Sequence, residues 1–419
     1  MDLSPPRGTV DLVPPLSGAL YEVSAAAHRV AGLFGFSYVE TPAFELTELF
    51  ARSSGESSDI VQKEMYTFED RGGRSLTLRP EGTAPIVRAY LAHRNDLPTP
   101  FKAYFIGPMW RYGRPQAGRA REFRQFDVEI IGTADPSADV DVIACGERFF
   151  EELGLQGYHL EINSIGDENC RPGYREVLIE YLEGQASRLR DEHRERFRDN
   201  PLRVLDCKDE ACRDVAEDAP KITDYLDDAC REHFDAVLTG LDNEGIKHQV
   251  VSTLVRGLDY YTRTAFEWTG DALPPGQASL GGGGRYDGLA EVLGGSHTPG
   301  VGFALGVEPR ILLALEAEGR LPQPPRVECF VVTVGPAATE HGRNLVRTLR
   351  AAGVSADASF EERPLKAQLR MADRGGARYA LILGEREAAA GTVTVRRLED
   401  GHEENVPATD VAGWISQQA

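Results

Sequence analysis

The chain has 419 residues, 41% of them hydrophobic, and its 66 acidic and 46 basic residues give a formal net charge of -20. This length exceeds one ordinary hydrophobic core, so we expect two or three domains. No apolar run is long enough to cross a bilayer, and the first residues lack the apolar segment of a secretory signal, which predicts a cytoplasmic protein without a membrane partner. The six scattered cysteines indicate reduced thiols rather than a disulfide framework.

The first elements expected along the chain are a helix and a short strand. Residues 16–33 carry apolar side chains at helical spacing and are followed by Gly35, a typical helix stop. Residues 36–40 then form a predicted strand before Pro42. Any amphipathic helix on an edge strand would show the same pattern, so this signal alone is weak.

A hairpin and a second helix follow. The glycine-containing turn at 70–73 and its alternating flanks predict a hairpin over residues 65–79. Pro85 suits the first turn of a helix that runs to about residue 93. Glu81 and Thr83 would lie at the junction between strand and helix, where capping of the helix is the alternative to a binding role.

Residues 107–132 form a basic hairpin in an otherwise acidic chain. The apolar run 104–110 and the alternation over 126–130 predict two strands joined by a long tip. So much local positive charge predicts that the hairpin binds an anion. Its five arginines, all within fourteen residues, are Arg111, Arg114, Arg119, Arg121 and Arg124.

The second strand of this hairpin has two different faces. If Phe126, Val128 and Ile130 point into a core, then the residues between them line the opposite face. That face would carry Asp127 and Glu129, together with the amide of Gln125. It suits a cationic or zwitterionic small molecule held beside phosphates. A hairpin with a solvated polar face and a loose basic loop is the alternative.

Long charged helices are expected between residues 170 and 248. Four potential zinc ligands occur in this region in a C-x4-C and C-x2-H pattern, but no hairpin is evident, and thiols in ordinary helices are the stronger interpretation. The candidate ligands are Cys207, Cys212, Cys230 and His233.

The stretch 253–267 places Arg256 among apolar and small residues, next to Tyr260 and Tyr261. A strand would turn the two tyrosines to opposite faces, so one could reach a ligand while the other packs, although a buried pair in the core is the simpler alternative. Residues 280–293 indicate a glycine loop leading into a helix, without the spacing of a P-loop or a dinucleotide site.

The proline-rich linker 319–326 marks a domain boundary. Beyond it, strand and helix patterns alternate, which predicts a small α/β domain with a mostly parallel sheet.

Three strings together resemble the histidyl-tRNA synthetases, a class II aminoacyl-tRNA synthetase family: RPEGT at 79–83, RPQAGR with REFRQFDVEIIG at 114–132, and LVRGLDYY at 254–261. The resemblance implies an α+β catalytic domain built on an antiparallel sheet, with a helical insertion, plus a C-terminal α/β anticodon-binding domain. The implied ranges are 1–169 for the first catalytic part with motifs 1 and 2, 170–248 for the insertion, 249–320 for the second catalytic part with the histidine signature and motif 3, and 326–419 for the anticodon-binding domain.

The resemblance also implies ATP-dependent activation of L-histidine and its transfer to histidine tRNA, with Mg²⁺ as cofactor and a homodimer as the assembly. It assigns catalysis to Arg111 and Arg256. Binding of histidine is implied for Glu81, Gly82, Thr83, Gln125, Glu129, Tyr260, Tyr261 and Tyr286, binding of ATP for Arg111, Arg119, Arg256 and Arg310, and contact with the tRNA acceptor end for Arg114, Gln116 and Arg121.

The motif 3 segment departs from the family pattern. Pro309 stands where the family has an arginine that contacts ATP, and Arg310 follows it. We therefore transfer that role to Arg310. Two other functions stay open at this point: the synthetase-like regulatory subunit of ATP phosphoribosyltransferase, which typically lacks the last domain and has degraded motifs, and a generic RNA-binding protein that uses the basic hairpin.

Overall fold

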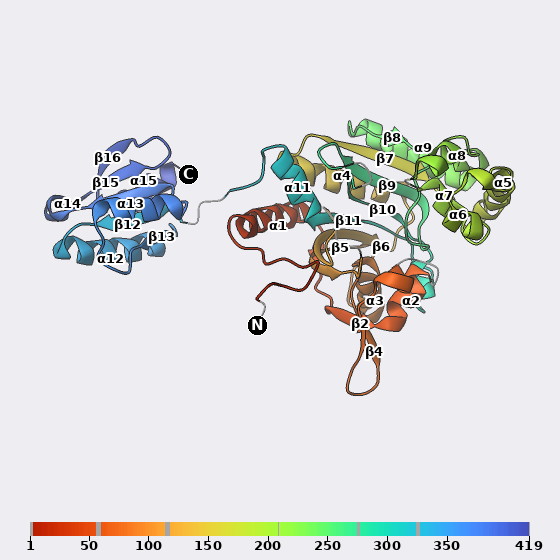
Figure 1. Ribbon diagram of the computed structural model, residues 1–419, viewed down its shortest axis with the longest axis horizontal. Helices are drawn as coiled ribbons and strands as arrows, with labels where there is room; N and C mark the ends of the chain where they lie inside the picture. Colours follow the sequence, from red (N-terminus) through yellow and green to blue (C-terminus); the bar gives the residue numbers. More distant parts are fainter. Residues whose placement is uncertain are drawn as a thin grey trace. The chain divides into compact units, whose positions relative to one another are not determined.

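The computed structural model describes residues 3–55, 60–113, 118–207, 209–274, 277–323 and 327–418 (Figure 1). Internal contacts divide the chain into two compact units, Met1–Pro322 and Gln323–Ala419. Within the described ranges, no helix combines the length and the apolar character that crossing a membrane requires.

The larger unit is built on an eight-stranded sheet in the order β1-β5-β6-β11-β10-β9-β7-β8. The outermost pairs, β1 with β5 and β7 with β8, are parallel, and the pairs between them are antiparallel. This confirms the predicted antiparallel sheet. Its strands are β1 (Ser37–Tyr38), β5 (Phe101–Trp110), β6 (Glu122–Ile131), β7 (Tyr158–Ser164), β8 (Gln249–Val250), β9 (Thr262–Gly270), β10 (Ser279–Arg285) and β11 (Gly300–Glu308).

One face of this sheet packs against helices α1 (Leu16–Leu33), α4 (Pro136–Leu153) and α11 (Arg310–Ala317). Phe126, Val128 and Ile130 of β6 belong to this core. The intervening residues Gln125, Asp127 and Glu129 are buried too, but outside that core, as the period of two requires. The other face of β6 is therefore free to build a polar site.

The other face of the sheet is flanked by smaller elements. Hairpin strands β3 (Thr67–Glu69) and β4 (Ser75–Leu78) join β2 (Phe44–Leu46) in a separate sheet. The predicted turn forms because Asp70 Oδ1 accepts hydrogen bonds from the backbone N–H groups of Gly72 at 2.8 Å and Arg74 at 3.0 Å. The neighbouring helical elements are α2 (Thr47–Ser54), the π-helical turn Ile60–Glu64, α3 (Thr83–His93) and α10 (Leu289–Val292).

The glycine run at 281–284 is not the predicted loop. It lies in β10, between β9 and β11, and is hydrogen-bonded to both. Glycine is a poor strand former by itself, but here the neighbours take the space of the missing side chains. A Cβ on Gly282 would lie 2.9 Å from Nη1 of Arg256, and one on Gly284 would lie 2.9 Å from the Tyr261 ring. Tertiary packing thus selects a strand where composition indicated a loop.

Helices and 3₁₀ turns account for most of the described chain between residues 171 and 243. The last helix of this region packs on α4, and its first helices share a core with the β5 and α3 side of the sheet. The elements are α5 (Arg171–Gly184), the 3₁₀ turn Ala186–Arg188, α6 (Asp191–Arg196), α7 (Leu202–Leu205), α8 (Glu210–Glu217), the 3₁₀ turn Ile222–Tyr225 and α9 (Asp228–Asn243).

The smaller unit holds a five-stranded sheet in the order β13-β12-β14-β15-β16. Its first two pairings are parallel and its last two are antiparallel, so the expectation of a mostly parallel sheet was wrong. The sequence-based prediction missed β16, which returns by a tight turn rather than through a helix. The elements are β12 (Cys329–Thr333), α12 (Pro336–Ala351), β13 (Ala356–Ala358), α13 (Leu365–Arg374), β14 (Tyr379–Leu383), α14 (Glu385–Ala390), β15 (Thr392–Arg397), β16 (Glu403–Pro407) and α15 (Val411–Gln417).

Candidate active site

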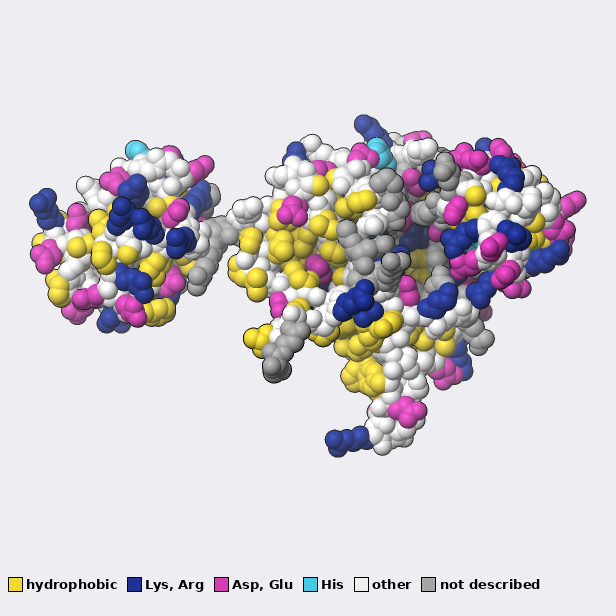
Figure 2. All heavy atoms as spheres, in the orientation of Figure 1, with side chains coloured by type: hydrophobic (Ala, Val, Ile, Leu, Met, Phe, Trp, Pro, Cys, Tyr) yellow, Lys and Arg dark blue, Asp and Glu magenta, His cyan; other side chains and the backbone are white. Residues whose placement is uncertain are grey.

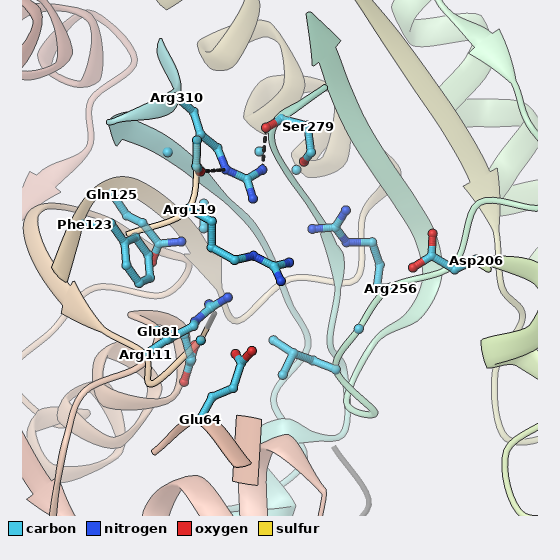
Figure 3. Close-up of a pocket in the computed structure, with 18 of the residues that line it drawn as sticks. Glu64, Glu81, Arg111, Arg119, Phe123, Gln125, Asp206, Arg256, Ser279 and Arg310 are labelled. Atoms are coloured by element: carbon cyan, nitrogen blue, oxygen red, sulfur yellow. Dashed lines mark hydrogen bonds between the residues drawn. The ribbon is translucent and has the colours of Figure 1, made fainter. Parts of the chain in front are cut away.

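A cavity of about 620 Å³ opens on the polar face of β6, β10 and β11, with the insertion forming one wall. Figure 3 shows that four guanidinium groups converge on this space from different parts of the chain. They come from the basic hairpin, from the LVRGLDYY stretch and from the start of α11. The four are Arg111, Arg119, Arg256 and Arg310, the set predicted to bind ATP.

Arg111 and Arg256 lie in one cavity although they are distant in sequence. Arg111 Nε donates to the backbone oxygen of Pro80 at 2.7 Å, and its guanidinium lies 5.2 Å from the centre of the Phe123 ring. Arg256 Nη1 lies 3.6 Å from a Glu267 oxygen. Burial lowers the pKa of Arg111, since a cation loses hydration there. An anion that entered the cavity would relieve this cost.

Arg310 reaches the cavity from the first turn of α11. Its side chain passes over Gly306, where a Cβ would lie 2.9 Å from Arg310 Cδ. The guanidinium donates to the backbone oxygens of Gly118, at 3.2 Å, and Ser279. Burial, followed by the nearby arginines of the cavity, lowers the pKa of Arg310 to about 10. Pro309 moves the arginine of motif 3 one position along the chain, but Arg310 still places a cation in the cavity.

Glu81 both caps a helix and lines the cavity. Its carboxylate accepts hydrogen bonds from the backbone N–H groups of Thr83 at 2.8 Å and Ala84 at 3.1 Å, at the start of α3. Burial raises the pKa of Glu81 to about 7. Glu81 therefore has the capping role considered from the sequence and also lines the cavity.

Further acceptors lie next to Glu81 on β6. Oε1 of Gln125 and both carboxyl oxygens of Asp127 accept no hydrogen bond from the described part of the chain. Asp127 faces Gly82, where a Cβ would lie 2.0 Å from Oδ2, so only glycine fits at that position. Burial raises the pKa of Asp127 well above its usual range, and the carboxylates of Glu129 and Glu81 raise it further. This group of acceptors suits an ammonium ion.

Glu129 lies deeper, beneath the cavity floor. Its carboxylate accepts hydrogen bonds from the hydroxyls of Thr83, at 2.6 Å, and Tyr286. It occupies the space above Gly302, where a Cβ would lie 1.8 Å from Oε2. Burial raises the pKa of Glu129 to about 8. Both predicted tyrosines of the signature stretch, Tyr260 and Tyr261, are buried, line the cavity and have ring centres 4.6 Å apart.

The predicted site residues thus divide into groups. Those on the cavity wall are Glu81, Thr83, Arg111, Arg119, Gln125, Arg256, Tyr260, Tyr261 and Arg310. Gly82, Glu129 and Tyr286 lie directly behind that wall. Arg121 points elsewhere: its guanidinium lies 3.9 Å from the centre of the Tyr112 ring and donates to the Arg7 oxygen at 3.3 Å. Arg114 and Gln116 fall outside the described residues.

The structure does not bring together the four candidate zinc ligands considered from the sequence. Cys207 and Cys212 lie near His193. Cys230 Sγ lies 3.8 Å from Cys170 Sγ, and His233 Nε2 lies 3.4 Å from Asp139. This separation agrees with the stronger interpretation from sequence, thiols in ordinary helices, because α9, which carries Cys230 and His233, packs on α4.

Several cavity residues were missed from the sequence. Phe123 precedes Gln125 by two, so the period of a strand could have placed it on the same face. Glu64 and the insertion residues follow no pattern that points to the site. Those from the insertion are Arg190, Glu192, His193, Arg203, Asp206, Cys207 and Asp209.

A buried ion pair away from the cavity wall was missed as well. Arg285 and Asp139 are both fully buried, and their ion pair fixes the end of β10 to α4.

Two family models match parts of this chain. A family model described as "Histidyl-tRNA synthetase" matches residues 8–309. The chain belongs to the histidyl-tRNA synthetase family. A second model, described as "Anticodon binding domain", matches residues 328–418, so the two family models together span both units of this synthetase family member.

Curated relatives of this family are similar over nearly the whole chain. A "Histidine--tRNA ligase" of Moorella thermoacetica is 49% identical over 98% of this chain and 97% of its own length. One of Desulforudis audaxviator is 48% identical over 100% of both chains. Among solved structures, the apo histidyl-tRNA synthetase of S. aureus is 36% identical with a TM-score of 0.79, covering 99% of this chain and 100% of its own.

Proposed function

We propose that the protein is an enzyme that activates L-histidine with ATP and transfers it to histidine tRNA. The observation that carries this proposal is the cavity, which is lined both by four arginines and by the buried acceptors Glu81 and Gln125. The arginines suit a polyphosphate, and the acceptors suit an ammonium ion beside it. Its relatives over the full length are histidine--tRNA ligases, and the complete LVRGLDYY string and the last domain exclude the regulatory-subunit alternative.

Arg111 and Arg256 carry the activation step. The carboxylate of histidine attacks the α-phosphorus of ATP, an O–P bond forms, and pyrophosphate leaves with the electron pair of the broken bond. Both reactants are anions, so placing them side by side is unfavourable without fixed positive charge. Two guanidinium groups from different walls neutralise the charge on the phosphate in the transition state and hold the reactants in line.

Arg119 and Arg310 are the groups for the terminal phosphates, and the Phe123 ring on the same wall is available for stacking with the base. Mg²⁺ prefers carboxylate oxygens together with substrate phosphates, and Glu308 offers such an oxygen beside Arg310. The Glu308 carboxyl suits such an ion. Burial raises the pKa of Glu308 to about 7, and a nearby dication would favour its ionised form. An ion held there would neutralise part of the phosphate charge.

Recognition of histidine falls to the acceptors. Glu81, Thr83 and Gln125 bind the α-ammonium group, whereas Glu129 and Tyr261 bind the imidazole nitrogens. An analogue without ring nitrogens would leave buried polar groups unpaired, which discriminates by a factor of order 10⁴ to 10⁵. This explains why a carboxyl as deeply buried as Glu129 is held by two hydroxyl donors.

The transfer step requires binding of tRNA by a strongly acidic chain. The tRNA hydroxyl attacks the carbonyl carbon of the adenylate, and AMP leaves. Arg114, Gln116 and Arg121 in the hairpin are the candidates for the acceptor end. In the smaller unit, Figure 2 shows Lys and Arg side chains gathered over α13, a helix that carries the exposed residues Lys366, Arg370 and Arg374. This local positive charge would contact phosphates.

The enzyme is proposed to act as a homodimer in the cytoplasm. Figure 2 shows hydrophobic side chains gathered over α1, and this region exposes Tyr21 and Leu33, each 71% accessible, with Tyr38 of β1 at 47%. An apolar surface of this kind suits a partner subunit.

One assay tests the proposed function: ATP–pyrophosphate exchange scanned over the amino acids, with and without tRNA. Exchange that depends on L-histidine and needs no tRNA is the expected result. A binding protein would show no exchange with any amino acid, and a synthetase for another amino acid would respond to that amino acid instead.

A further inference from the structure

The insertion contains a cluster of metal-binding side chains that the proposed reaction does not use. The ligand atoms of His193, Cys207 and Cys212 all lie within 4.8 Å of one another. His193 is in α6, Cys207 follows α7, and Cys212 is in the first turn of α8. Three short helices therefore direct one imidazole and two thiols to the same point.

This donor set is chemically selective. Two cysteine sulfurs with a histidine nitrogen favour Zn²⁺ over hard cations such as Mg²⁺. Ligand atoms around a tetrahedral zinc lie roughly 3.3 to 3.8 Å apart, given the usual Zn–S and Zn–N lengths. The cluster is therefore within about 1 Å of a bound geometry, and side-chain rotation alone could close that gap.

Zinc binds the neutral imidazole of a histidine and the thiolate of a cysteine, so the ion would displace any proton that these ligands carry.

A second cluster, at the boundary of the insertion, is not equivalent. Asp167, Cys170, Asp227 and Cys230 also approach one another, but both carboxylates already have structural roles. Asp227 accepts from the Cys230 backbone N–H at 2.8 Å and caps α9, and Asp167 accepts from the Asn169 N–H at 2.9 Å and pairs with Arg263 at 3.3 Å. Hydrogen bonds to backbone N–H groups and an ion pair with Arg263 therefore account for the two carboxylates.

We propose that His193, Cys207 and Cys212 bind one Zn²⁺ ion, with water in the fourth position, and that this ion ties α6, α7 and α8 together. The helices have only six, four and eight residues, too few to be stable without tertiary contacts. The same segments place Arg203 and Asp206 on the cavity wall. The ion therefore holds one wall of the active site in position without taking part in the chemistry.

The test uses full-length protein, stripped with a chelator under a thiol reductant and titrated with Co²⁺ alone. Tetrahedral Co²⁺ bound to thiolates gives visible d–d bands and a sulfur-to-metal charge-transfer band. We expect saturation at one equivalent, displacement of the bands by Zn²⁺ and a higher melting temperature with Zn²⁺. Cys207→Ser and Cys212→Ser should each abolish the charge-transfer band of the one-equivalent complex, and His193→Asn should weaken binding at least tenfold.

Cys230→Ser is the matched control, because it removes a buried thiol from the neighbouring helix and should keep the full spectrum. The proposal is overturned if the reduced protein, with all six thiols titratable, gives no charge-transfer band. It is equally overturned if Cys230→Ser removes the band while Cys207→Ser and Cys212→Ser leave it intact. None of these readouts depends on activity, so failure here is distinct from failure of the proposed function.

Discussion

The hydroxyl of Thr83 donates a 2.6 Å hydrogen bond to the carboxylate of Glu129, across 46 residues of chain. The bond links the first turn of α3, in the RPEGT stretch, to the polar face of β6. Tyr286 donates to the same carboxylate from a third segment. Three motifs that are separate in sequence therefore converge on one buried acid, the group we assign to the imidazole of histidine.

Loss of the Tyr286 hydroxyl should weaken this arrangement selectively. In Tyr286→Phe, Glu129 keeps only one hydroxyl donor, so we expect the KM for histidine to rise about tenfold, the equivalent of about 1.4 kcal/mol. The KM for ATP should stay unchanged, because the arginines are untouched. Steady-state exchange kinetics measure both constants. Tyr225→Phe, at an exposed position of the insertion, is the control, and equal changes in both constants would contradict the assignment.

The stability of the protein should depend on pH through Glu129. Burial raises the pKa of this carboxyl from 4.5 to about 8, so the folded state retains a proton that the unfolded state loses above pH 4.5. The free energy of unfolding therefore falls as pH rises from about 4.5 to about 8, by about 1.4 kcal/mol per unit from this group. The Glu129→Gln side chain has no proton to lose. Its free energy of unfolding should therefore increase relative to that of wild type as pH rises across this window.

Urea unfolding at pH 5.5 and pH 7.5 measures this difference. Glu151→Gln, at an exposed position on α4, should follow the wild-type pH profile. If Glu129→Gln also runs parallel to wild type, the carboxyl does not hold its proton when folded. The same variant should lose discrimination for histidine, so the buried acid costs stability and contributes specificity.

Arg256→Ala should all but abolish histidine-dependent ATP–pyrophosphate exchange. We expect the exchange rate to fall by at least two to three orders of magnitude, because one of the two guanidinium groups at the α-phosphate is lost. Circular dichroism and the melting temperature should show an intact fold. Arg29→Ala, which removes an exposed arginine paired with Glu152, serves as the control. Exchange at the wild-type rate in Arg256→Ala would rule out the role of this residue.

Arg310→Ala tests the departure in motif 3. If Arg310 supplies the cation that Pro309 displaced, its loss should raise the KM for ATP at least tenfold and leave the KM for histidine unchanged. Arg310→Lys should recover part of the affinity, because it restores charge without the planar fork. An unchanged KM for ATP in Arg310→Ala would mean that the neighbouring arginines suffice.

Charge reversal on α13 should separate the two steps of the reaction. Arg370→Glu with Arg374→Glu places acidic groups on the basic face of the smaller unit, so aminoacylation should fall at least tenfold and exchange without tRNA should not change. Arg343→Glu with Arg347→Glu, on α12, is the matched control, because α12 packs on the other side of the sheet. Equal losses in both double variants would indicate a general charge effect.

Much of this protein could be predicted where the signal is local. The helix at Leu16–Leu33 has the predicted bounds, because helical periodicity depends only on neighbouring residues. The polar face of β6 followed from a period of two, and the arginine cluster was visible against a net charge of -20. The same reasoning failed for the glycine run of β10 and for the return strand β16, whose conformations depend on partners elsewhere in the chain.

The sequence by itself determined the kinds of groups in the site and their order on strands and helices, since spacing within one element dictates which side chains share a face. Only the tertiary structure decided which elements meet. It brought Arg256 to Arg111, placed Arg310 in the cavity despite Pro309, and paired Cys207 and Cys212 with His193 rather than with Cys230. Such pairings depend on how whole helices and strands bury their apolar faces, a long-range outcome that spacing along the chain does not record.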